Sequence, residues 1–106
     1  MSHNRDTKMP NAAMIANEMQ NIVRRAAEPW APGDSIKAAL DRAARRTGLG
    51  FRRVRTLWYR QTEAISAWEA DTLREWHRDW LANERARLQA RIADLETEWE
   101  RLGSHE

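Results

Sequence analysis

Residues 40–59 read LDRAARRTGLGFRRVRTLWY, and this stretch decides the fold that we expect for the whole chain. Gly48 lies near its middle, with a small residue, Ala44, four positions earlier and Leu49 directly after it. Glycine adopts a left-handed backbone conformation without a Cβ penalty, so Gly48 is expected to end one helix and open a tight turn. A second helix is expected to start near Phe51. The stretch therefore predicts two helices joined by a short turn.

The apolar residues on either side of this turn are phased so that the two helices can pack together. Leu40 and Ala43 supply one face, and Val54 and Leu57 supply the other. With Ala44 at the expected crossing point, the pattern resembles the DNA-binding helix-turn-helix superfamily. The resemblance covers about twenty of the 106 residues. It implies that the helix beginning near residue 51 enters the major groove of duplex DNA.

Two residues depart from the pattern of that superfamily. Gly50 stands where a Ser or Thr N-cap is common, although glycine is tolerated there. Phe51 places a bulky aromatic side chain at the start of the recognition helix, where exposed polar residues are usual. Phe51 either belongs to the core or touches a thymine methyl group.

The outward face of the same helix carries the expected base contacts, which by the resemblance are Arg52, Arg55, Thr56 and Tyr59. Arginine can hold guanine O6 and N7 with two hydrogen bonds, so Arg52 and Arg55 are the main candidates for base recognition. The expected phosphate contacts are Lys37, Arg45, Arg46, Arg53 and Arg60. Phosphate contacts give affinity and register but carry no sequence information.

The charge distribution supports a local polyanion site. Residues 34–60 hold eight basic side chains against two acidic ones, a net of +6, whereas residues 61–106 have a net of −5. A short basic block beside an acidic segment is typical of a protein that binds nucleic acid. The alternative is that the arginine-rich face is merely solvated, or that it pairs with the acidic segment of a partner chain.

The residues before this motif predict two further features of the domain. Residues 1–10 are polar and non-periodic, which indicates a disordered tail. Asn11 is expected to cap a first helix running to about residue 27, and Asp34 or Ser35 a second helix at residues 36–47. The inner faces are expected to include Met14 and Ile36, and Trp30 in the intervening loop to plug the edge of the core. Residues 11–61 are thus interpreted as the helix-turn-helix domain.

After Arg60 there is no proline, and no glycine until Gly103, so residues 62–102 are interpreted as one long helix within a segment spanning 62–106. Trp68, Trp76 and Trp80 lie on one side of its first half. We expect them to serve core or dimer packing, because the opposite side mixes acidic and basic residues and so does not fit a membrane-surface helix.

The second half of this helix carries apolar residues at alternating steps of four and three, the spacing of a coiled coil. These residues form what we call the seam: Leu81, Leu88, Ile92, Leu95, Trp99 and Leu102. The seam does not continue the register of the tryptophans, and the shift falls near Asn83. The first half is therefore expected to pack on the domain, and the seam to form a dimeric coiled coil.

Several classes of function are disfavoured by the sequence. The chain has no cysteine, hence no disulfide or thiolate metal site, and no apolar run near the ~20 residues that span a bilayer. His77 has no second ligand at metal spacing, and no phosphate-binding glycine loop or catalytic constellation is evident. We therefore expect no enzyme, no cofactor, no membrane partner and, in so short a chain, no small-molecule effector.

The sequence thus predicts an all-α protein: a small helix-turn-helix domain followed by a long C-terminal helix. The expected function is sequence-specific binding of double-stranded DNA by a cytoplasmic, nucleoid-associated homodimer, as in a bacterial or phage regulator of transcription. The alternative is a helical protein-protein interaction module, an adaptor or inhibitor, that does not bind DNA.

Overall fold

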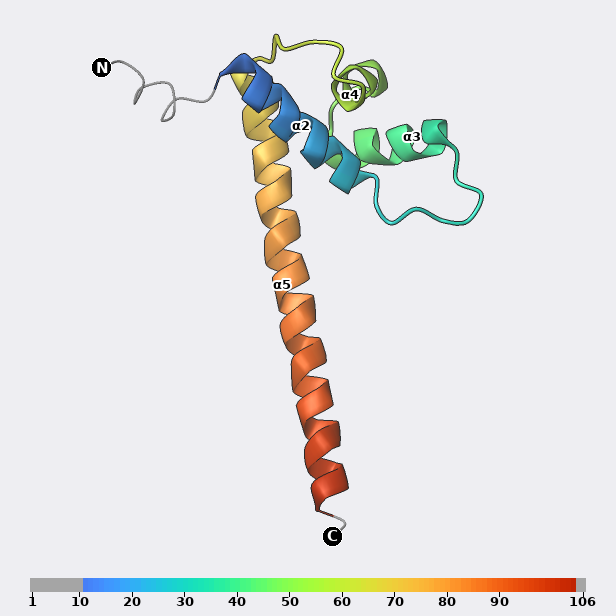
Figure 1. Ribbon diagram of the computed structural model, residues 1–106, viewed down its shortest axis with the longest axis vertical. Coiled ribbons are helices and arrows are strands. Elements are labelled where there is room, and N and C mark those ends of the chain that lie inside the picture. The colour runs from blue at the N-terminus through green and yellow to red at the C-terminus, as the bar shows by residue number, and fades with distance from the viewer. Residues whose placement is uncertain (1–10, 105–106) are drawn as a thin grey trace, which may run out of the picture.

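The computed structural model describes residues 11–104 and is helical throughout apart from the connecting loops, with no strand among those residues. This confirms the expected all-helical class with a long last helix. The expected tail at residues 1–10 lies outside the described residues. The helices, labelled in Figure 1, are α2 (Ala12–Ala26), α3 (Ile36–Thr47), α4 (Phe51–Trp58) and α5 (Ala67–Gly103).

The first three of these helices pack around one core against the N-terminal part of α5, and α2 contacts all the others. The largest fully buried side chains are Met19, Val23, Val54, Leu57 and Leu73. They come from α2, α4 and α5, so the core joins the long helix to the domain. The remainder of α5 runs away from the domain and stands clear of the other helices (Figure 1).

The expected helix ends at Asn11 and Gly48 are confirmed. The Asn11 side chain accepts a hydrogen bond from the Met14 N–H at 2.8 Å. Of the two residues expected to cap α3, Ser35 does so, accepting from the Ala38 N–H at 3.1 Å. Gly48 ends α3 at φ 82°, and its N–H donates to the carbonyl of Ala44. Side-chain oxygens and a left-handed glycine thus satisfy the backbone groups that helix ends leave free.

The expected start of the long helix at residue 62 is wrong, because α5 begins at Ala67. A Schellman motif ends α4: the Arg60 N–H donates to the carbonyl of Leu57, and the Gln61 N–H to that of Thr56. The left-handed position of this motif is taken by Arg60, at φ 56°, instead of the usual glycine. A loop follows up to Ser66, which caps α5.

Several apolar side chains lie at the surface, although they were expected in the core or, for Trp68, in core or dimer packing. Met14 is 56% exposed, Ile36 is 43% exposed and Trp68 is 64% exposed. Each stands in the first turn of its helix, beyond the region that the neighbouring helices cover. Trp30 is also exposed, although its ring lies 6.2 Å from that of Trp58. The core therefore depends on the second and later turns of the helices.

The C-terminal half of α5 is unpartnered. Residues 85–104 are all exposed, and the six seam residues are between 47% and 77% exposed. The expected change of packing near Asn83 is therefore confirmed, because α5 loses contact with the domain there. We call residues 84–103 the arm. Within residues 11–104, no helix is both long and apolar enough to cross a membrane.

Candidate nucleic-acid interface

The turn between α3 and α4 sets the orientation of the candidate surface. Leu49 is buried in the turn, and Val54 and Leu57 are buried on the inner side of α4. Phe51 packs half-buried against the core, which favours its structural role over contact with a base. Because α4 buries these positions, its remaining side is turned toward solvent.

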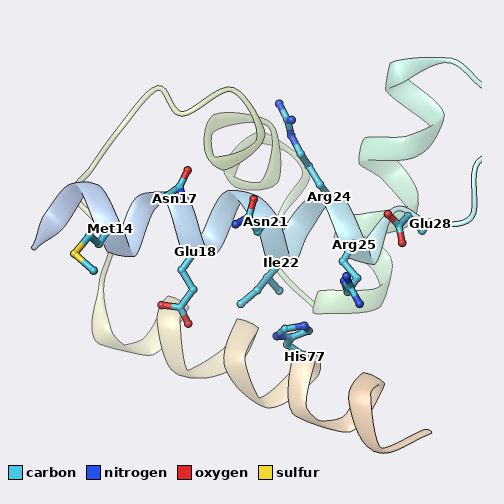
Figure 2. A pocket seen from close by; sticks show the side chains of 9 residues that line it. All are labelled: Met14, Asn17, Glu18, Asn21, Ile22, Arg24, Arg25, Glu28 and His77. Carbon is cyan, nitrogen blue, oxygen red and sulfur yellow. The ribbon is translucent and has the colours of Figure 1, made fainter. Parts of the chain in front are cut away.

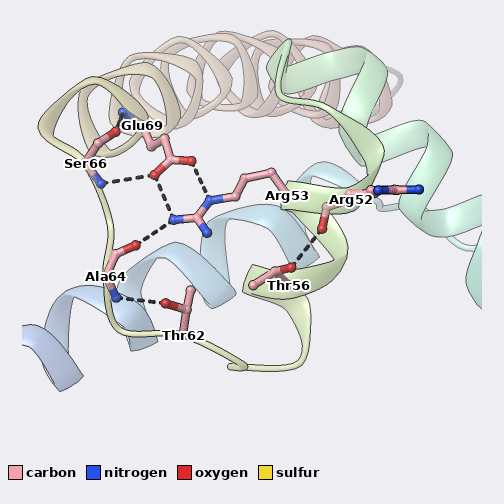
Figure 3. Close-up of polar contacts among 7 residues, drawn as sticks. All are labelled: Arg52, Arg53, Thr56, Thr62, Ala64, Ser66 and Glu69. Atoms are coloured by element: carbon pink, nitrogen blue, oxygen red, sulfur yellow. Dashed lines mark hydrogen bonds and ion pairs between the residues drawn. The ribbon is translucent and has the colours of Figure 1, made fainter.

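That solvent side carries the residues expected to contact bases. Arg52, Arg55 and Tyr59 are exposed, and the side chains of the two arginines make no hydrogen bond or ion pair within residues 11–104. Thr56 is half-buried, and its hydroxyl donates to the carbonyl of Arg52 at 3.0 Å (Figure 3). Two guanidinium groups thus remain free to meet an external partner.

Arg53, an expected phosphate contact, is engaged within the protein. Its Nε and Nη2 bind both carboxylate oxygens of Glu69, and Nη2 also donates to the carbonyl of Ala64 at 2.7 Å (Figure 3). This hydrogen bonding from Arg53 lowers the pKa of Glu69. Glu69 in turn accepts from the Ser66 N–H and completes a capping box at the start of α5. Arg53 therefore ties α4 to α5.

Arg46, another expected phosphate contact, binds the end of α2. Its Nη1 donates to the carbonyl of Ala26 at 3.0 Å and also to that of Glu28. One turn earlier, Arg42 donates to the carbonyl of Ala27 and pairs with Asp34 at 2.9 Å. Two arginines of α3 thus cap the carbonyl end of α2, a site where positive charge is favourable.

Arg60 is the third expected phosphate contact with internal partners. Its Nη1 donates to Asn17 at 3.1 Å, and its Nη2 lies 3.6 Å from the Glu63 carboxylate. Lys37 and Arg45, by contrast, are exposed on α3 and form no hydrogen bond or ion pair among the described residues. Of the five expected phosphate contacts, two are therefore free for a ligand.

One further cation beside α4 could not be predicted from the sequence. Arg24 of α2 donates to the carbonyl of Trp58 at 3.3 Å, and its guanidinium lies 5.4 Å from the centre of the Trp58 ring. Gln20 donates to the same carbonyl at 2.9 Å. Only the packing of α2 across α4 brings these residues there. Arg24 is exposed and adds positive charge at the end of α4.

An open groove of about 670 Å³ lies between α2 and α5 (Figure 2). Glu18 on its α2 side pairs with Arg74 of α5 at 2.7 Å, and this hydrogen bonding lowers the pKa of Glu18. Farther along, the guanidinium of Arg25 lies 4.4 Å from the centre of the Trp80 ring, and His77 stacks on the same ring. These charged groups join α2 to α5, so the groove is a helix junction and not part of the α4 surface.

Comparison with protein-family models, curated proteins and solved structures finds no match to this chain. The candidate interface consists of the side chains that the fold leaves free: Arg52, Arg55, Lys37 and Arg45.

Proposed function

We propose that this chain binds duplex DNA sequence-specifically, as a homodimeric regulator of transcription, with α4 in the major groove. One observation carries the proposal. The solvent side of α4 presents Arg52 and Arg55 exposed and without internal partners, whereas Arg42, Arg46 and Arg53 are held in the fold. Arginines that stabilise nothing within the protein, on a helix after a tight turn, fit the recognition of bases.

The other free cations supply affinity. Lys37 and Arg45 lie on α3, two helical turns apart, where each can neutralise a phosphate. Release of condensed counterions makes such binding fall steeply with salt, with a slope that reports the number of phosphates contacted. Two to four such contacts in one domain give weak binding, so a second domain is needed for a tight complex.

The seam supports a dimer. Six large apolar side chains on one helix, all roughly half exposed or more, form a long apolar surface of a kind that soluble proteins usually bury. Burying each is worth roughly 1.5–3 kcal/mol, so five or six per chain can offset the cost of association. The proposal involves no catalytic step and no small-molecule effector.

The test measures binding of labelled duplex DNA by fluorescence anisotropy. A selection from random duplexes first supplies a bound sequence, and binding is then compared with that of an unrelated duplex across a salt series. Arg52→Ala and Arg55→Ala should each lose about 1–3 kcal/mol on the selected site and less on the unrelated one. Arg78→Ala removes an equal charge from an exposed position of α5 and should change neither.

Two results would count against the proposal. Equal losses on both duplexes would reduce Arg52 and Arg55 to phosphate contacts and remove sequence-specific reading. Absence of duplex binding near physiological salt would leave the protein-protein interaction module as the better description.

A further inference from the structure

The seam lies nearly on the same side of α5 as the domain. An α-helix turns by about 100° per residue, which places the centre of the seam about 60° around α5 from the side that carries Ala70, Leu73 and Trp76. Those residues pack on α2 and α3, so the domain covers this side of α5 as far as Glu84. The arm starts where the domain ends. Anything that binds the seam therefore approaches from the side of the domain.

This geometry disfavours a parallel pair of chains. In a parallel coiled coil the two helices run side by side in register, with axes about 8–10 Å apart. The N-terminal half of each α5 would then lie beside that of the other, and each domain, only about 60° from the seam, would crowd the second helix. Since α5 is one continuous helix from Ala67 to Gly103, it contains no break at which the two chains could diverge.

We infer that the seam binds a second copy of this chain in the antiparallel direction, with Glu84 of one arm opposite Gly103 of the other. In this alignment the whole arm of one copy pairs with the whole arm of the other, and the paired region ends at the edge of each domain. It also brings the seam residues within the arm into register, whereas Leu81 lies before the arm. Ile92 meets Leu95, and Leu88 meets Trp99, each pair occurring twice by symmetry.

The charges that flank the seam fit the same alignment. In the heptad that the seam defines, Arg91 and Glu98 occupy equivalent flanking positions, which antiparallel chains bring face to face. The pairing places Arg91 of each copy within about one helical turn of Glu98 of the other. Sliding the arms by one heptad in either direction would instead oppose glutamate to glutamate, so the charges also select the register.

Arg85 provides a further reason to favour the antiparallel orientation. It occupies a core position of the heptad, where a parallel dimer would place it against Arg85 of the second copy. In the antiparallel alignment it meets Leu102, at the end of the paired region, where its long side chain can reach solvent. An arginine at this core position is thus tolerated by one orientation and opposed by the other.

The orientation determines where the two domains lie. The Leu73 residues of the two copies, at which the domains pack on α5, come to lie about 60 Å apart along the paired helices. Successive major grooves on one face of B-DNA repeat every 34–36 Å, so this separation corresponds to about 1.7 turns of the duplex. This last consequence depends on the proposed DNA binding, whereas the orientation itself does not.

Charge reversal distinguishes the two orientations with a matched pair of variants. Glu98→Arg should weaken dimerisation on the order of tenfold, because each copy then sets an arginine at position 98 against Arg91 of the other, twice in the dimer. Glu96→Arg makes the same change of charge but faces Gln89 in the antiparallel pair, so the Kd should change less than about threefold. Adding Arg91→Glu to Glu98→Arg should restore the dimer. In a parallel dimer Glu96 would face Arg91. Glu96→Arg would then weaken dimerisation, and Glu98→Arg would have little effect.

Cross-linking gives an independent test, since the chain has no cysteine of its own. Antiparallel packing puts Leu88 opposite Trp99 but leaves the two copies of Leu88 about 16 Å apart, beyond the reach of a disulfide. Mild oxidation should therefore cross-link a mixture of Leu88→Cys and Trp99→Cys chains to each other, while Leu88→Cys alone stays uncross-linked.

Sedimentation of the intact chain without DNA completes the test. A dimer of twice 12.4 kDa with the cross-linking pattern above supports the inference. Disulfides formed by Leu88→Cys alone would overturn the orientation, and a chain that stays monomeric at high micromolar concentration would overturn the pairing. Neither result bears on whether α4 binds DNA. If the chain formed an antiparallel dimer but did not bind duplex DNA, only the proposed function would be overturned.

Discussion

The ion pair between Arg53 and Glu69 should stabilise the junction of α4 with α5, and Glu69→Gln removes its charge with little change of shape. Hydrogen bonds to charged groups contribute about 1.5–3 kcal/mol when buried, whereas exposed ion pairs contribute about 0–1 kcal/mol. The two side chains are 30% and 13% exposed, so the pair lies between these cases. We expect Glu69→Gln to lower the free energy of unfolding by about 1 kcal/mol, and Arg53→Ala by about 2 kcal/mol because it also loses the Ala64 carbonyl.

Thermal unfolding followed by circular dichroism measures this effect, at one protein concentration for all variants because dimerisation would shift Tm. In a domain of this size a loss of 1 kcal/mol lowers Tm by roughly 4–8 °C. The double variant should be less destabilised than the sum of the single variants, since each single change already breaks the pair. Glu75→Gln, an exposed position on the same helix, is the control and should leave Tm unchanged.

The pH dependence follows from the lowered pKa of Glu69. The carboxylate is charged in the folded state at pH values where the unfolded chain would already bind a proton. Its stabilisation is therefore complete above its ordinary pKa of 4.5 and is lost as the pH falls through the lower folded value. The difference in free energy of unfolding between the natural chain and Glu69→Gln should therefore disappear under strongly acidic conditions. If Arg53→Ala left Tm unchanged but weakened binding equally on the selected and the unrelated duplex, Arg53 would be a phosphate contact and this reasoning would be refuted.

Three further variants probe the turn, the core and the arm. Gly48→Val should cost more than about 1 kcal/mol in unfolding free energy, because a β-branched residue resists φ 82°, whereas Gly50→Ala, at φ −68°, should be nearly neutral by the same thermal assay. Leu73→Ala should lower the unfolding free energy by about 2–5 kcal/mol in denaturant titration, since Leu73 is fully buried where α5 meets the domain. The combined change Ile92→Asp and Leu95→Asp should give a folded monomer by light scattering, with much weaker DNA binding; an unchanged dimer would place the contact elsewhere.

The positions of most helix ends could be predicted because local chemistry determines them. A helix end depends here on the side chain or the backbone freedom of one residue, so the residue type predicts it; this holds for Asn11, Ser35 and Gly48. The loop that separates α4 from α5 was not predicted, because an arginine takes the left-handed position where glycine is usual, and tertiary contacts of Arg60 hold it there. The start of α5 did carry a signal, Ser66 followed three residues later by Glu69, which forms the capping box.

The sequence predicted which arginines of α4 face outward, but not which arginines bind other groups within the protein. Helical phase alone placed Arg52 and Arg55 outward, because the inward positions are apolar. Phase could not show that Arg53 and Arg46 are engaged, since their partners lie 16 or more residues away in the chain and depend on how the helices cross. A run of arginines therefore overstates the charge available to a ligand until the intramolecular partners are known.

If the arms pair as inferred, the shape of this protein depends on its concentration. A helix of about twenty residues gains most of its stability from packing, so an unpaired arm should fray from its free end and be stabilised on meeting another. Pairing is a second-order process, and well below the dimer Kd a doubling of chain concentration yields about four times as many dimers. If the dimer is the form that occupies DNA, the response of its target to the abundance of the protein is steeper than linear. Such a threshold in protein concentration would arise from pairing of the exposed arm and would require no small-molecule ligand.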